Sequence, residues 1–166
     1  SAGTIEGVRG VLIYMAIYMV MSLGTFACIL AMRRRGKMVE KIDDLAGLSK
    51  SNPGLAIAFA IFMFSMAGIP PLAGFFGKLY VFLAAIEEQL YLLAIIGVLS
   101  SAVGAFYYIR IVKLMYFDDA LEGFDKPIGK EISGVLVSTG ILILLFFAYP
   151  TPVLDGAQAA AELLLR

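Results

Sequence analysis

The chain has 166 residues, of which 61% are hydrophobic and 16% are charged, and its 13 Lys and Arg residues balance 13 Asp and Glu residues. This apolar excess goes well beyond the roughly half-apolar composition of soluble domains and indicates a membrane protein, and the zero net charge gives no sign of a nucleic-acid partner. One cysteine and no histidine exclude a disulfide framework and leave no conventional metal site.

The first predicted element is an uncharged helix over residues 10–32, which is long enough to cross a bilayer. It contains small or weakly polar residues that allow helices to pack closely in lipid, and we interpret it as a structural span. These are Ser22, Gly24, Thr25 and Ala27. Residues 33–53 follow, with six of the Lys and Arg residues. A basic run beside a span is more typical of a topology signal than of a lipid-binding patch.

The second element, residues 54–86, is nearly continuous in apolar character but is interrupted by Gly68-Ile69-Pro70-Pro71. Two prolines remove two backbone donors and disfavour helical geometry in the residues before them. The sequence therefore predicts one crossing broken at 68–71 into two half-helices, 54–67 and 72–86. In hydrocarbon such a break is tolerated only where it is buried in protein or lines a wet cavity.

Lys78 is the only charged residue within this element. At ~1.5 Å per residue it lies about 13 Å from the Glu87-Glu88 pair that closes the element, which is too deep for its side chain to reach bulk water. We expect Lys78 to face a partner or a polar channel. The alternatives are that the proline pair is a passive kink and that Lys78 lies near an interface.

The remaining predicted elements are a third span at 89–109, a fourth at 132–149 and an amphipathic tail at 153–166 that lies on the membrane surface. Ser100 and Ser101, at the centre of the third span, serve either close packing or a file of water molecules. Together these elements predict an all-α fold, a single membrane domain over residues 1–166. It would be a polytopic transmembrane helical bundle of four spans, the second of them discontinuous.

The basic residues predict the orientation of this bundle. Residues 33–53 and 110–131 hold ten of the thirteen Lys and Arg residues. The positive-inside rule places both segments in the cytoplasm or an equivalent matrix, and both termini outside. Four crossings alternate correctly only if the proline-broken element counts as one.

Two runs of this sequence resemble a known family. They are DLAGLSKSNPGLAIAFAIFMFSMAGIPPLAGFFGKLYVF, residues 44–82, and AFYYIRIVKLMYF, residues 105–117. Both are similar to the antiporter-like, proton-conducting subunits of respiratory complex I, the NADH:quinone oxidoreductase. The resemblance extends from about residue 8 to residue 149, and its most specific part joins the helix break to a lysine at fixed spacing.

The resemblance implies two inverted five-helix repeats, each with a broken helix, of which the second repeat is represented here. Lys78 matches the family's ionisable residue that relays protons toward the outer half-channel. Ser65, Gly68, Pro70 and Pro71 match the break itself. The chain is about a third of family length, so the upstream part that carries the inner proton path would be missing from it.

The family likeness implies a subunit of a redox-driven proton translocase with no redox chemistry and no cofactor of its own. NADH, FMN, iron–sulfur clusters and quinone would belong to partner subunits. The implied partners are the other complex I subunits, the lipid bilayer and the missing upstream part. The implied location is the bacterial inner membrane, with the mitochondrial inner membrane as the alternative.

Three functions are compatible with these observations. The first is proton translocation through Lys78, where dehydration favours the neutral amine and hydration or a nearby carboxylate favours the charged form. The second is a subunit of a cation/proton antiporter or of a membrane-bound hydrogenase. The third is a non-conducting membrane scaffold, in which Lys78 would be salt-bridged and inert.

Overall fold

The structure, a computed structural model, describes residues 4–165, and within them the prediction of an all-α fold is confirmed. The helices are α1 (Ile5–Leu30), α2 (Leu48–Ser51), α3 (Pro53–Ala67), α4 (Ala73–Glu87), α5 (Tyr91–Phe117), α6 (Lys130–Leu145) and α7 (Thr151–Leu164). A 3₁₀ turn covers Ile42–Leu45, and two short strands, β1 (Arg33–Arg34) and β2 (Lys37–Met38), form an antiparallel hairpin.

Several helices extend beyond the predicted apolar stretches. Thr4 caps α1, its hydroxyl accepting a hydrogen bond from Gly7 N at 3.2 Å, so the helix starts five residues before Gly10. The Asn52-Pro53 pair starts α3, with proline in the first turn, where its missing N–H is not needed. Arg110 and Lys113, which the sequence suggested were in a loop, lie on the last turns of α5. The helix thus continues past its apolar stretch, because polar side chains at a helix end do not prevent helical hydrogen bonding.

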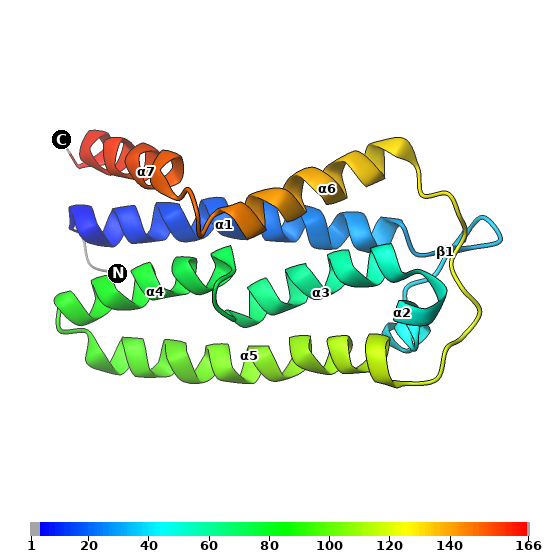
Figure 1. The fold of residues 1–166 in the computed structure, drawn as a ribbon. Helices are drawn as coiled ribbons and strands as arrows, with labels where there is room; N and C mark the ends of the chain where they lie inside the picture. Colours follow the sequence, from blue (N-terminus) through cyan, green and yellow to red (C-terminus); the bar gives the residue numbers. More distant parts are fainter. Residues whose placement is uncertain (1–3, 166) are drawn as a thin grey trace.

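Figure 1 shows α3 and α4 following one another end to end between α1 and α5. On its other sides, α1 packs against α6 and α7. Small residues bring the helices together: a Cβ atom at Gly24 of α1 would overlap the ring of Phe62 on α3, and one at Gly10 would lie 3.2 Å from the Tyr80 carbonyl on α4. This is the close backbone approach that small residues allow in lipid.

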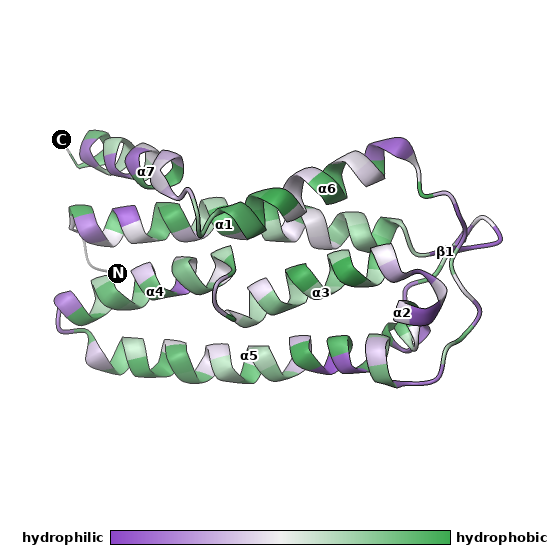
Figure 2. Ribbon diagram, viewed as in Figure 1, coloured by the Kyte–Doolittle hydropathy of each residue, from purple (hydrophilic) through white to green (hydrophobic). Residues whose placement is uncertain are grey.

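Two helices of the described chain, α1 and α5, are long and apolar enough to cross a membrane by themselves, and α3 is a shorter apolar helix. Figure 2 shows hydrophobic colour along the helices and hydrophilic colour gathered at the loops. We call the end with the β1–β2 hairpin and residues 118–129 the basic end, and the opposite end, with the α4–α5 connection, the turn end. The two segments that hold ten of the Lys and Arg residues, 33–53 and 110–131, both lie at the basic end (Figure 1).

Helix α7 covers most of the predicted amphipathic tail, whose last residue, Arg166, lies outside the described residues. The helix packs alongside the N-terminal half of α1 (Figure 1). Ala157 and Ala161, one helical turn apart, form its buried face, while Leu163 and Leu164 are exposed. The location of this segment relative to a lipid surface stays a prediction.

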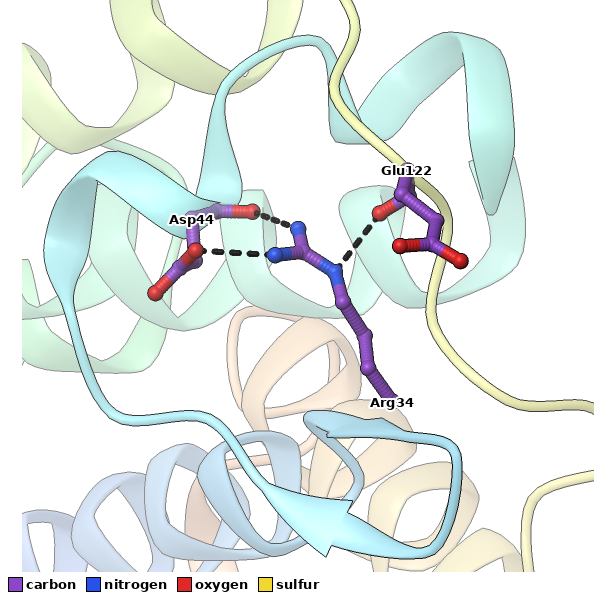
Figure 3. A network of polar contacts seen from close by, with 3 residues as sticks. All are labelled: Arg34, Asp44 and Glu122. Carbon is purple, nitrogen blue, oxygen red and sulfur yellow. Dashed lines mark hydrogen bonds and ion pairs between the residues drawn. The ribbon is translucent and has the colours of Figure 1, made fainter.

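Arg34 ties three segments together at the basic end (Figure 3). Its guanidinium donates to the Asp44 carboxylate at 2.8 Å, to the Asp44 carbonyl at 3.1 Å and to the Glu122 carbonyl at 2.7 Å. The guanidinium carbon also lies 5.1 Å from the centre of the Phe124 ring. The planar fork of arginine suits this three-way contact, which a lysine ammonium cannot reproduce.

Asp125, in the same α5–α6 connection as Glu122, binds the β1–β2 hairpin. Its carboxylate accepts hydrogen bonds from Gly36 N at 2.8 Å and Arg35 N at 2.9 Å, where both residues have positive φ in a tight turn. These two backbone donors, Gly36 first, lower the pKa of Asp125 below its usual value.

We predict that Arg34→Lys lowers the free energy of unfolding by about 1–3 kcal/mol, because the Asp44 and Glu122 acceptors lose charge-assisted partners. Arg35→Lys is the matched control, since the Arg35–Glu122 ion pair is 83% and 60% exposed and such pairs contribute little. Thermal denaturation of the detergent-solubilised protein measures both. Equal effects in the two variants would contradict the role of Arg34.

The Asp125 clasp predicts an acid-sensitive hairpin. Because the folded-state pKa is lowered, its stabilising contribution is complete above the unfolded-state pKa of about 4 and disappears as pH falls through the folded-state value. Limited proteolysis within residues 33–38 should therefore accelerate on acidification. In Asp125→Asn, cleavage should be fast already at neutral pH and should change little with acid; a wild-type pH dependence in this variant would refute the assignment.

Candidate functional site

The candidate site is the interruption between α3 and α4. Helix α3 ends at Ala67 because Gly68 takes a left-handed conformation, with φ at +85°, which costs glycine little. The N–H groups of Gly68 and Ile69 both donate to the Phe64 carbonyl, at 3.1 and 3.0 Å. Helix α4 starts at Ala73. Pro70 and Pro71 lie exposed between the two helices.

Ser65 joins the two helix ends. Its side chain is fully buried, and its hydroxyl accepts a hydrogen bond from Gly74 N at 3.0 Å. The same hydroxyl lies 3.0 Å from the sulfur of Met21 on α1. One of the unpaired N–H groups in the first turn of α4 is thereby satisfied by a side chain of α3.

Gly74 makes this approach possible. A Cβ atom at this position would overlap the Ser65 carbonyl oxygen, and the Met21 sulfur would be 3.0 Å from it. The first turn of α4 therefore rests directly on the last turn of α3, a contact that any larger residue would force apart.

Lys78 reaches back across the interruption to the end of α3. Its ammonium donates to the Met66 carbonyl at 2.8 Å and to the Ala67 carbonyl at 3.3 Å. These are last-turn carbonyls with no partner inside the helix, and they lie at the negative end of the α3 dipole. The positive charge and the unpaired acceptors therefore stabilise one another.

The partners of Lys78 are backbone groups and not side-chain carboxylates. None of the ion pairs in residues 4–165 includes Lys78. Gly68 also borders the amine: a Cβ atom there would lie 3.2 Å from the Lys78 Cδ and 3.4 Å from its Nζ. The scaffold hypothesis, which required a salt-bridged lysine, finds no such bridge in the described chain.

Two cavities border Lys78, with volumes of about 230 and 220 Å³. Polar side chains from α1 and α5 line both, including Tyr14 and Ser101. Larger cavities elsewhere, such as the one between α3 and α6, are lined mainly by apolar residues. Within residues 4–165 no cluster of His, Cys, Asp and Glu side chains could hold a metal ion.

The structure brings together three of the five residues that the sequence singled out. Ser65, Gly68 and Lys78 meet at the interruption, whereas Pro70 and Pro71 shape the connection from its exposed side. The sequence interpretation missed Gly74 and Tyr14. Gly74 belongs to the run of small residues just after the prolines, which was a usable signal. Tyr14 lies in the uncharged part of α1, after Arg9, where no neighbouring charge drew attention to it.

Comparison with known proteins identifies relatives for this whole arrangement. Residues 1–104 match the sequence profile of a family described as NADH:quinone oxidoreductase/Mrp antiporter, transmembrane. The chain is 62% identical to NADH-quinone oxidoreductase subunit N of Rhodospirillum rubrum, over 99% of this chain and 34% of that protein. It is 59% identical to subunit N of Parvibaculum lavamentivorans, with the same coverage of each. The chain thus spans about a third of the length of the curated relatives it matches.

Solved structures agree with the sequence comparison. A chain of respiratory complex I from Thermus thermophilus with bound aureothin superposes with a TM-score of 0.76 at 27% identity, over 89% of this chain and 34% of that one. A second chain, from the same organism's complex I with bound NADH, has a TM-score of 0.65 at 21% identity, which supports the fold alone.

We predict that Gly74→Ala separates α3 from α4 and lowers stability by roughly 1–3 kcal/mol, since the added methyl meets backbone. Gly140→Ala on α6 is the control, because open space surrounds a Cβ atom there. Thermal denaturation in detergent gives the difference. If both variants are as stable as the unmodified protein, the close approach at Ser65 is wrong.

Proposed function

Because the chain belongs to the NADH:quinone oxidoreductase/Mrp antiporter family of transmembrane proteins, we propose that it forms the proton-relaying part of an N-type membrane subunit of NADH:quinone oxidoreductase. The observation that carries the proposal is the Lys78 ammonium, hydrogen-bonded to the helix-end carbonyls of Met66 and Ala67 and bordered by two polar-lined cavities. An ionisable group at an interrupted helix is a typical feature of ion-translocating membrane proteins.

In this proposal the chain crosses the membrane four times, through α1, the α3–α4 pair, α5 and α6. Helices α3 and α4 have 15 residues each. At ~1.5 Å per residue each is about 22 Å long, which is shorter than the ~30 Å hydrocarbon core. Their end-to-end arrangement beside α1 and α5 supports counting them as one discontinuous crossing (Figure 1). Residues 132–149 form the fourth crossing, and the tail from residue 153 follows it.

We further propose that the basic end faces the cytoplasm of a bacterial cell and that both chain termini lie on the outer side of its inner membrane. Residues 33–53 and 110–131, which hold ten of the Lys and Arg residues, lie together at the basic end, while the start of α1 and the end of α7 lie toward the turn end (Figure 1). Their common location supports the positive-inside assignment.

The chemistry assigned to this chain is proton transfer alone. A hydronium ion on one side of Lys78 gives a proton to the neutral amine: the nitrogen forms an N–H bond as an O–H bond of the hydronium breaks, and a water molecule remains. The ammonium then returns a proton to water on the other side. Dehydration favours the neutral form and contact with water or carbonyl oxygens favours the charged form, so a change in hydration drives the cycle. Oxidation of NADH and reduction of quinone, with FMN and iron–sulfur clusters, would occur in partner subunits.

A cation/proton antiporter subunit is the second candidate, because the family description covers Mrp antiporters as well. Purification of the native assembly distinguishes the two. Subunits that bind flavin and reduce quinone should accompany this chain under the first proposal, and they should be absent if the chain belongs to an antiporter.

We predict that Lys78→Met reduces proton pumping by about tenfold or more in the assembled complex, within the range that general acid–base groups contribute. Assembly should be retained, because methionine fills the same space and the two cavities that border residue 78 leave room for water to reach the Met66 and Ala67 carbonyls. Lys113→Met is the control: Lys113 is exposed and pairs with Asp118 near the end of α5. Pumping is measured as acidification of inverted membrane vesicles per NADH oxidised.

Two results would contradict this assignment. Normal pumping in a fully assembled Lys78→Met complex would remove the relay role. Loss of assembly, with normal pumping by the complexes that do form, would favour the scaffold function instead.

A further inference from the structure

The two cavities beside Lys78 are displaced from each other along the helix axes. The one of about 230 Å³ also borders Gly104 and Tyr108 of α5, toward the basic end. The one of about 220 Å³ borders Gly97 of α5 and Phe82 of α4, toward the turn end. We call them the basic-end cavity and the turn-end cavity. From Gly97 to Tyr108 the α5 axis advances about 16 Å.

Three residues line both cavities: Tyr14 of α1, Lys78 of α4 and Ser101 of α5. Each comes from a different helix, so the junction between the cavities is formed where three helices meet. At ~30 Å³ per water molecule, each cavity has room for several. These three side chains are therefore the ones that both cavities share.

The three side chains at this junction can still form hydrogen bonds with water. The Lys78 ammonium has three N–H donors and uses two on the Met66 and Ala67 carbonyls, which leaves one. The Tyr14 and Ser101 hydroxyls are not hydrogen-bonded to any protein atom within residues 4–165. A hydroxyl donates and accepts at the same time, so it can continue a chain of water molecules where an apolar side chain would interrupt it.

The linings of the two cavities differ in polarity. Toward the basic end, Tyr18 and Tyr108 add two more hydroxyls, and the Tyr14 and Tyr18 rings stack with their centres 5.8 Å apart. Toward the turn end the lining changes to Val81 and Phe82, and a Cβ atom at Gly97 would lie 2.6 Å from the Phe82 ring. The basic-end cavity is therefore rich in hydroxyl groups, and the turn-end cavity is more apolar.

From this arrangement we propose that Tyr14 and Ser101 are positioning residues for the proton transfer at Lys78, holding water on either side of the amine so that it exchanges protons with both cavities. This inference rests on the proposed proton-relay function and adds two residues to it. It also assigns Ser101 to the water file and not to helix packing alone. Neither hydroxyl gains or loses a proton: each holds water in place by accepting one hydrogen bond and donating another.

The test uses the complete subunit in its assembled, membrane-embedded complex. The double variant Tyr14→Phe, Ser101→Ala removes only two oxygen atoms. We expect pumping per electron to fall about fivefold, the size of effect typical of a lost hydrogen bond, with normal complex abundance. The solvent deuterium isotope effect on pumping should rise, because proton transfer becomes slower than the other steps. A purely structural role would not move the isotope effect.

The matched control is Tyr107→Phe, Ser138→Ala. Tyr107 is an exposed neighbour of Tyr108 on α5, and Ser138 is exposed on α6; neither lines these cavities. Pumping and its isotope effect should be unchanged. Ser101→Thr retains the hydroxyl and should also pump normally. If pumping falls as much in Ser101→Thr as in Ser101→Ala, the shape of the side chain and not its hydroxyl causes the loss, and the proposal is overturned.

Lys78→Met in the same assay separates this inference from the function on which it rests. If Lys78→Met abolishes pumping while the double variant pumps normally, the hydroxyl junction is wrong and the relay stands. If Lys78→Met itself pumps normally, the proposed function is wrong. Should the double variant assemble poorly, the single variant Tyr14→Phe is tested in its place. Unchanged pumping and an unchanged isotope effect in that variant overturn the proposal.

Discussion

The structure depends on the contact between the Lys78 ammonium and the carbonyls of Met66 and Ala67. A helix that stops within hydrocarbon leaves acceptors without donors, and a lysine at the same depth carries a charge without a counterion. Either feature alone would be costly. Together each satisfies the other, because Gly68 turns the chain so that α4 brings its lysine back to the end of α3.

The rest of the site holds this contact in register. Ser65 and Gly74 join the two helix ends through a hydrogen bond at 3.0 Å, and the sulfur of Met21 on α1 contacts the same serine hydroxyl. Lys78 keeps one N–H free for the cavities between α1, α4 and α5. The same amine therefore stabilises the interruption and faces the space through which a proton would arrive. In the proposed relay, a change in hydration at the amine would change the strength of the helix-end contact and so link proton loading to the local structure.

The sequence was sufficient to predict features with a local cause. The proline pair drew attention to residues 68–71, which lie between α3 and α4, and the isolated charge drew attention to Lys78. It was insufficient where the cause was tertiary. Lys78 pairs with two backbone carbonyls, which the residue types in the sequence do not reveal. Tyr14, which lines the same cavity, lies 64 positions before Lys78 in the sequence. Likewise, apolar length alone placed the end of the third span at residue 109, whereas α5 continues to Phe117 because its last turns leave the apolar region and pack on the loops of the basic end.

The most direct test is a high-resolution structure of the complete complex in a lipid environment, in which the chain between α3 and α4 and the surroundings of Lys78 are resolved. The account predicts that residues 68–72 are non-helical, that the Lys78 Nζ lies within hydrogen-bond distance of the Met66 and Ala67 carbonyl oxygens, and that ordered water contacts its remaining N–H. A helix that runs unbroken through these residues, or a Lys78 amine paired with a carboxylate and shielded from water, would contradict it.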